Sequence, residues 1–212
     1  AAETFNHRVY VLENRSADPF APTWVERGQV DTGWESFALD ATSFVLDGTQ
    51  YLVWAQQDVT IRGNSNLYIA PMANPPWTLA GPAVLLTRPP EHDWETAGFW
   101  VNEGPSVLVR EGRVLLTYSG AATGPEYAMG LLTASTDADL LDPRVVDQER
   151  RPPCSSATPD HHQYGPGHNS FTTTPPDGDV VLVYHARTYT QIDGDPLWDP
   201  PNRHARAQVL PF

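Results

Sequence analysis

Short apolar segments that alternate with polar residues recur along the whole chain, and turn dipeptides separate them. Three long segments are alike, because each begins with a polar residue, enters an apolar strand, turns at Asp-Gly or Glu-Gly, and returns through β-branched and aromatic residues. This pattern is typical of a β-hairpin. The three segments are residues 40–54, 103–118 and 168–184. A further strand-like segment follows each hairpin, so we predict an all-β protein of repeated antiparallel sheets. These additional segments are residues 66–71, 127–134 and 204–210.

The three hairpins restart at nearly constant spacing. Their leading residues are Asp40, Glu103 and His168, which are 63 and 65 positions apart. A repeat of about 60 residues with four strands is typical of a propeller blade with long loops. The first strand of each blade lines the central axis, so we expect these three side chains to converge at one end of the channel. A two-sheet sandwich is the alternative, but it does not require hairpins at a constant interval.

The N-terminal residues resemble the second half of such a blade. Residues 8–13 are similar to a third strand and residues 24–30 to an outer strand, but no inner hairpin precedes them. The sequence therefore predicts half a blade followed by three full ones. A closed propeller needs about four blades or more, so we expect an upstream segment, a separate chain or a second copy to complete the ring. We accordingly expect these 212 residues alone not to form a stable, active monomer.

Composition and charge narrow the class of partner. The formal net charge of −13 disfavours nucleic acid and anionic membranes, whereas a neutral polysaccharide stays compatible. The 21 Pro and 15 Gly residues suit many short strands joined by ordered turns. The one cysteine, Cys154, rules out an internal disulfide framework, and we interpret it as a loop thiol. The sequence shows neither a signal peptide nor an apolar run of about 18 residues.

Two acidic residues are the strongest candidates for chemistry. Glycoside hydrolysis needs two carboxylates on opposite sides of the scissile bond. Burial near a propeller axis raises a carboxyl pKa, which suits a general acid. Glu103, within the sequence VNEGP, and Asp40 fit this requirement, although each could instead cap a loop. His168 could ligate a metal, orient an acid or be structural, and we interpret His161 and His162 as surface residues.

Arginine and tryptophan side chains suit sugar recognition. The guanidinium fork recognises hydroxyls and carboxylates, although surface ion pairing is the alternative. The arginines that flank the last predicted strands are Arg187, Arg203 and Arg206. Trp94 and Trp100 could stack on sugar rings, whereas Trp54 ends a core strand and is better suited to packing.

Five motifs carry a resemblance to a known family. They are YVLENRSADPF, NLYIAPM, VNEGP, GPGHNSF and VYHAR, at residues 10–20, 66–72, 101–105, 165–171 and 183–187. In them the chain is similar to glycoside hydrolase family 43, and within it to the α-L-arabinofuranosidases and exo-arabinanases. The resemblance implies a single catalytic domain that is a five-bladed propeller and hydrolyses with inversion. Residues 1–35 would then end blade two, and residues 36–98, 99–163 and 164–212 would form blades three, four and five.

The resemblance also implies roles for individual residues. Glu103 matches the general acid, and Asp40 matches the third acid, which tunes the pKa of the general acid and orients it. His168 matches the channel histidine, which in several members faces a bound calcium or other ion. No cofactor is required, and a calcium ion held through water is compatible with this histidine. Arg203 is the best match to the substrate-binding arginine, with Arg206 as its rival.

The expected activity is release of α-L-arabinofuranose from arabinan or arabinoxylan side chains by a secreted enzyme. Phe37 and Trp100 are expected to contact the sugar, and the bulk of Trp100 would narrow the pocket. The family's general base is an aspartate of the first blade, so here it is expected from outside this sequence. Alternatives are a β-xylosidase or endo-arabinanase of the same family. The alternative from another class is a non-catalytic or incomplete propeller that needs another chain for its base.

Overall fold

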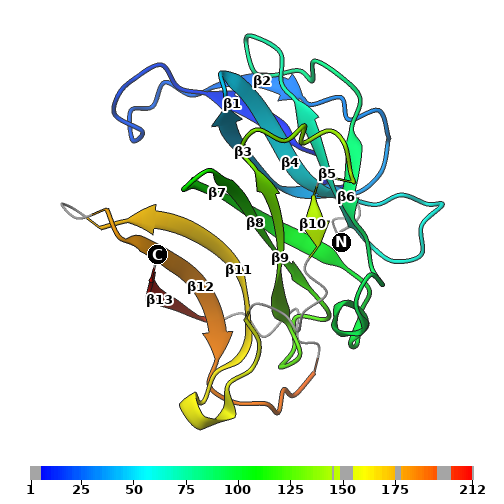
Figure 1. Cartoon of the computed structure of the whole chain (residues 1–212), viewed down its shortest axis with the longest axis vertical. Coiled ribbons are helices and arrows are strands. Elements are labelled where there is room, and N and C mark those ends of the chain that lie inside the picture. The colour runs from blue at the N-terminus through cyan, green and yellow to red at the C-terminus, as the bar shows by residue number, and fades with distance from the viewer. Residues whose placement is uncertain (1–5, 145, 149–154, 175–177, 195–201, 212) are drawn as a thin grey trace.

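The computed structural model of the chain describes residues 6–144, 146–148, 155–174, 178–194 and 202–211. It is an all-β structure of four antiparallel sheets, as predicted, with two single-turn 3₁₀ helices (Figure 1). The first sheet pairs β1 (Tyr10–Glu13) with β2 (Val25–Gln29). Each of the other three sheets is a meander in chain order.

The second sheet contains β3 (Ala38–Leu46), β4 (Thr49–Gln56), β5 (Asn66–Pro71) and β6 (Val84–Thr87). The third contains β7 (Asn102–Arg110), β8 (Arg113–Gly120), β9 (Ala128–Ser135) and β10 (Asp147–Gln148). The fourth contains β11 (Tyr164–Thr173), β12 (Val180–Arg187) and β13 (His204–Leu210), which are three strands among the described residues where a full blade predicts four. The 3₁₀ helices are η1 (Asp93–Thr96) and η2 (Pro159–His161).

Successive sheets pack face to face, and the core lies in layers between them. Between the β3–β6 and β7–β10 sheets, buried aliphatic side chains interdigitate, Ile69 and Leu132 among them. Trp54 is fully buried in the layer that β1 and β2 share with the second sheet, so its predicted packing role is confirmed. Met129 and Leu182 lie in the layer between the third and fourth sheets. Face-to-face layers of this kind are how propeller blades bury their apolar surface.

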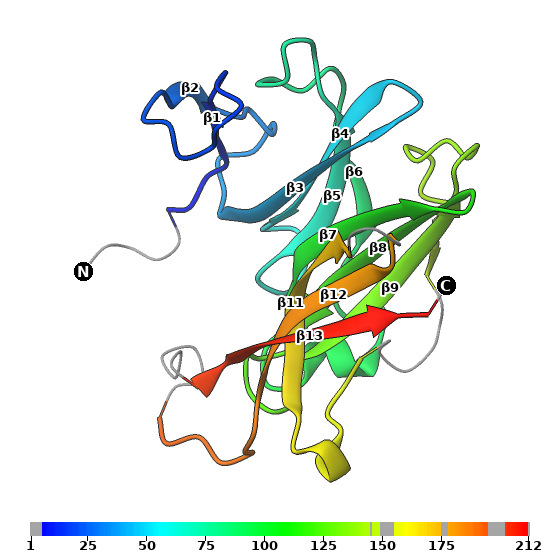
Figure 2. The same cartoon turned by 90° about the vertical axis from the view of Figure 1, so that its left-hand side faces the viewer.

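The first strands of the three larger sheets, β3, β7 and β11, lie side by side (Figures 1 and 2). Each carries a β-bulge near its beginning, where two residues face one residue of the next strand. The first residue of each bulge has a left-handed backbone. These residues are Asp40 (φ 53°), Gly104 (φ 55°) and His168 (φ 48°).

The bulges reveal the true phase of the repeat. Asp40, Gly104 and His168 are 64 positions apart in both intervals. The structural repeat therefore runs through Gly104, and the predicted equivalence of Glu103 with Asp40 and His168 is wrong by one residue. Glu103 lies one residue before the bulge, paired with Ser119 of β8. Asp, Asn and His are the side chains that tolerate a left-handed backbone best after glycine, which explains why acidic and histidine residues occupy the other two positions.

Candidate active site

The three bulges meet at one point. The backbone N–H of Gly104 donates to Asp40 Oδ2 at 3.0 Å, and His168 Nδ1 lies 3.9 Å from the same oxygen. Gly104 makes this approach possible, because a Cβ at its position would lie 3.2 Å from His168 Cγ. The Asp40 side chain keeps 19% of its surface exposed and that of His168 keeps 49%. The structure therefore brings Asp40 and His168 together where a ligand can reach them.

Glu103 lies beside this pair and has an unusual environment. Tyr127 donates its hydroxyl hydrogen to Glu103 Oε1 at 2.8 Å. Burial is the larger cause that raises the pKa of Glu103, and the charge of Asp40 raises it further, against the Tyr127 hydrogen bond. Glu103 nevertheless stays partly accessible, as a proton donor to a substrate must. A carboxyl group with a raised pKa next to a second carboxylate has the features of a general acid.

The support behind Glu103 was not predicted from the sequence. Tyr127 is almost completely buried, and the ring of His185 stacks on it with centroids 5.5 Å apart and planes at 7°. Gly167 leaves room for the Tyr127 ring, because a Cβ there would lie 2.1 Å from Tyr127 Cε1. Burial, followed by the positive charges of Arg203, His168 and Arg187, lowers the pKa of His185 to about 4, so its imidazole is neutral at neutral pH.

A second buried carboxyl group, Glu95 of η1, lies behind the beginning of β7. Its Oε1 accepts from the Tyr118 hydroxyl at 2.7 Å and from Asn102 Nδ2 at 3.2 Å, and its Oε2 accepts from the His92 backbone N–H at 2.8 Å. Burial raises the pKa of Glu95. The sequence offered no signal for this cluster beyond the acidic residue itself. It anchors Asn102, the residue before Glu103.

Arg203 directly precedes β13, and its charge acts on both Glu103 and His185. Arg206 lies within β13, and its buried Nε has no hydrogen-bond partner among the described residues. Arg187 is fully buried and donates to the Thr123 carbonyl. Of the three arginines, Arg203 and Arg187 carry the charges that lower the pKa of His185.

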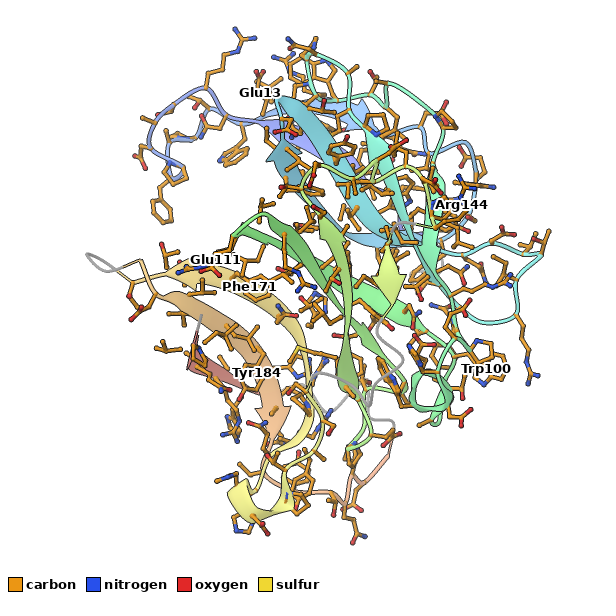
Figure 3. All side chains as sticks on the ribbon, viewed as in Figure 1. Glu13, Trp100, Glu111, Arg144, Phe171 and Tyr184 are labelled. Carbon is orange, nitrogen blue, oxygen red and sulfur yellow. The ribbon has the colours of Figure 1, made fainter. Side chains whose placement is uncertain are left out.

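The structure gives the surroundings of Phe37 and Trp100, the two aromatic residues predicted to contact the sugar. Phe37 is buried, and its ring centroid is 5.1 Å from that of His7. Trp100 carries the guanidinium of Arg62 over its ring at 3.9 Å, and Figure 3 shows it at the edge of the molecule, toward the β4–β5 loop. Neither residue has a described contact with Glu103, so their roles in sugar binding stay predictions.

The other residues singled out in the sequence are His161, His162, Trp94 and Cys154. His161 and His162 are exposed. Trp94 is half-buried, and its ring is tilted by 31° against that of Tyr118, with the centroids 5.8 Å apart. Cys154 lies outside the described residues. Within the described ranges, no group of three or more His, Cys, Asp or Glu side chains is arranged to hold a metal ion. A search of the same residues for a helix long and apolar enough to cross a membrane found none.

A glutamate with a raised pKa near a second carboxylate fits the general acid of a glycoside hydrolase. The model of the family described as "Glycosyl hydrolases family 43" matches residues 1–212. The chain belongs to this family.

Two relatives and one solved structure show what the chain is similar to within that family. The chain is 50% identical over 206 residues to "Alpha-L-arabinofuranosidase 43" of Humicola insolens, covering 96% of this chain and 42% of that protein. It is 47% identical over 197 residues to "Extracellular exo-alpha-(1->5)-L-arabinofuranosidase" of Streptomyces chartreusis, covering 92% and 59%. The crystal structure of an alpha-L-arabinofuranosidase from Lactobacillus brevis superposes with a TM-score of 0.90 at 53% identity, covering 97% and 62%. The chain thus spans less than two thirds of each.

Proposed function

We propose that this chain forms the larger part of the catalytic domain of an inverting α-L-arabinofuranosidase. The observation that supports the proposal most is the environment of Glu103, whose pKa is raised by burial and by Asp40 while Tyr127 holds one of its oxygens. The printed activities of the relatives from Humicola insolens and Streptomyces chartreusis, at 50% and 47% identity, support the choice of arabinofuranose as the sugar released.

The proposed reaction assigns one role to each residue of the cluster. Glu103 protonates the glycosidic oxygen as the bond to the anomeric carbon breaks. The negative charge of Asp40 keeps the pKa of Glu103 high. Arg203, whose charge acts on Glu103, lies next to β13 of the fourth sheet and binds the sugar hydroxyls from that side. Arg206 is the alternative residue for this role.

The general base is proposed to be an aspartate outside residues 1–212. An inverting enzyme needs a carboxylate about 6.5–9.5 Å from the general acid, with a water molecule between them and the sugar. We propose that this carboxylate comes from a further blade, which completes a five-bladed propeller with the half blade and three blades of this chain. The side-by-side arrangement of β3, β7 and β11 supports such a ring (Figure 2).

The proposed substrates are arabinan and arabinose-decorated xylan outside the cell, in line with the word "extracellular" in the name of the relative from Streptomyces chartreusis. The resemblance also implies a calcium ion near His168. Calcium takes about six to eight oxygen ligands, and the described residues contain no group of three or more His, Cys, Asp or Glu side chains arranged to hold a metal ion. No step of the proposed reaction is therefore routed through a metal.

The test is hydrolysis by the full-length protein of nitrophenyl α-L-arabinofuranoside, nitrophenyl β-D-xyloside and an arabino-oligosaccharide. We expect the enzyme to hydrolyse both arabinosides and to hydrolyse the xyloside at least about tenfold more slowly. A difference of about tenfold is on the order of what one altered contact to the sugar supplies. The Glu103→Gln variant should lose the oligosaccharide activity by about 10²–10⁴-fold and retain more activity on the aryl glycoside, whose leaving group needs less protonation. Preferred xyloside hydrolysis, or equal losses on both arabinosides, would refute the assignment.

A further inference from the structure

A chain of hydrogen bonds runs from the backbone of the fourth sheet to Glu103. The His168 N–H donates to Ser119 Oγ at 2.8 Å. Ser119 hydrogen-bonds the phenolic oxygen of Tyr127, and Tyr127 contacts Glu103 Oε1 at 2.8 Å. Ser119 is fully buried and Tyr127 nearly so, which makes the direction of each bond in this chain matter.

The direction of the chain is fixed at its first member. A backbone N–H can only donate, so Ser119 Oγ accepts from His168 and keeps its own hydrogen for the Tyr127 oxygen. Tyr127 already accepts from Ser119, and its own hydrogen points to Glu103 Oε1. Burial, followed by the charge of Glu103, raises the pKa of Tyr127 well above its ordinary value, so the phenol stays protonated and remains a donor.

We propose that Tyr127 is a positioning residue that places the transferable proton of Glu103 on Oε2. The proposal rests on the general-acid role of Glu103 in the proposed function and names how that role is achieved. The carbonyl oxygen of a protonated carboxyl group accepts a hydrogen bond better than its hydroxyl oxygen does, so the bond from Tyr127 favours the form in which Oε1 is the carbonyl oxygen. The carboxyl proton therefore occupies Oε2, which leaves a single oxygen able to protonate a substrate.

The same arrangement serves the proton transfer itself. When the Oε2–H bond breaks, its proton passes to the glycosidic oxygen, and the C–O bond to the anomeric carbon breaks with its electron pair going to that oxygen. Water adds to the anomeric carbon and gives its proton to the base. Glu103 is left as a carboxylate, and the Tyr127 hydroxyl continues to donate to Oε1, where it stabilises the new negative charge.

The packing around the Tyr127 ring holds it in this position. His185 stacks on one face, with centroids 5.5 Å apart, and the missing side chain of Gly167 leaves the space that the ring edge fills. A ring confined in this way cannot swing its hydroxyl away from Glu103 without displacing the fourth sheet.

The decisive variant is Tyr127→Phe in the full-length protein, with Tyr118→Phe as its matched control. Both tyrosines are buried and both donate to a buried glutamate, Tyr127 to Glu103 at 2.8 Å and Tyr118 to Glu95 at 2.7 Å. Loss of the donor destabilises the Glu103 carboxylate, so its pKa rises. The alkaline limb of kcat/KM should move up by about 1–2 pH units in Tyr127→Phe and stay in place in Tyr118→Phe.

The oligosaccharide should also suffer more than the aryl glycoside in Tyr127→Phe, by about tenfold or more, because only the former depends on protonation of the leaving group. If Tyr127→Phe does not fold, Ser119→Ala should move the same limb in the same direction by a smaller amount. An unchanged limb in every variant that folds, or an equal shift in Tyr118→Phe, overturns the proposal.

Titration of the ¹³C-labelled Glu103 carboxyl by NMR, assigned with Glu103→Gln, separates this inference from the proposed function. It measures the pKa of Glu103 even in a protein that hydrolyses no arabinoside. A raised Glu103 pKa in Tyr127→Phe with no glycosidase activity in the wild type would support the hydrogen-bond chain and reject the enzymatic assignment. Glycosidase activity in the wild type, with the same Glu103 pKa in Tyr127→Phe as in the wild type, would support the enzymatic assignment and reject the hydrogen-bond chain.

Discussion

Gly167→Ala is a small substitution that should disable the site, because its methyl group would displace the Tyr127 ring and crowd the Ser119 hydroxyl. The added Cβ would lie 2.1 Å from Tyr127 Cε1, 2.4 Å from Tyr127 Cδ1 and 3.1 Å from Ser119 Oγ. Carbon atoms pack at about 3.5–4.0 Å, so the ring must move by roughly 1 Å or more. The backbone of Gly167 is not among the left-handed positions, and the methyl group is therefore the whole perturbation.

The magnitude follows from this displacement. Overpacking a dense interior costs about 1–3 kcal/mol, which the fold should survive. A shift of roughly 1 Å in the group that orients the general acid should lower kcat on an arabino-oligosaccharide by about 10²-fold. The assay is steady-state hydrolysis by the full-length protein, with the free energy of unfolding measured by urea denaturation on the same samples.

Gly81→Ala is the matched control for this substitution. Its Cβ would meet only Pro71, at 3.4 Å from Cγ, and its backbone is also outside the left-handed region. Stability should change by no more than about 0.5 kcal/mol and kcat should not change. If Gly167→Ala retained the kcat and stability of Gly81→Ala, the close contact between Gly167 and Tyr127 would not be a feature of the protein in solution.

Three further predictions concern the neighbouring groups. Asp40→Asn removes a charge that raises the pKa of Glu103, so the alkaline limb of kcat/KM should move to lower pH, and an unmoved limb in a folded variant would remove Asp40 from the site. Glu95 has a pKa raised by burial, so it stabilises the fold most when protonated and loses this contribution as pH rises through its folded pKa. The stability advantage of the wild type over Glu95→Gln, followed by thermal denaturation from about pH 4 to pH 8, should therefore shrink with rising pH, and a constant difference would contradict the raised pKa. Gly104→Ala and Gly112→Ala both place a methyl group on a left-handed backbone, at φ 55° and 73°, but only the first would crowd another side chain. Both should lose about 1 kcal/mol of stability, and only Gly104→Ala should lose activity, by a few-fold on the order expected for a shift of a few tenths of an ångström.

The hairpins could be predicted from the sequence because local chemistry determines them. The β3–β4 and β7–β8 turns place Asp47, Gly48, Glu111 and Gly112 at φ of 48°, 77°, 50° and 73°. Two consecutive positive φ values define the type I′ turn, for which Asp-Gly is a favoured sequence. The alternation of apolar residues on either side then determined the strands and their order.

The phase of the repeat could not be obtained in the same way. A bulge adds one residue to a strand without a characteristic composition, and matching acid with acid aligned Glu103 with Asp40. The sequence did contain one signal for the position of this bulge, which is the glycine after Glu103. Glycine adopts a left-handed backbone most readily, and Gly104 has φ 55°. Tyr127 and Glu95 were missed for a related reason, since their partners come from other strands and only the tertiary fold brings them together.

The offset between Glu103 and the structural repeat explains how two nearby carboxyl groups come to lie in different environments. Asp40 occupies the repeated position, where it accepts the Gly104 N–H and stays close to His168 and to the exposed side of the site. Glu103 is one residue earlier and reaches the enclosed side, where Tyr127 receives it and burial raises its pKa. Successive residues of a strand point to opposite sides. A glutamate at position 104 would instead begin with its Cβ against His168, 3.2 Å from the ring, and both acids would share one environment. The two carboxyl groups can therefore take different roles, because the sequence departs from its own repeat by one residue.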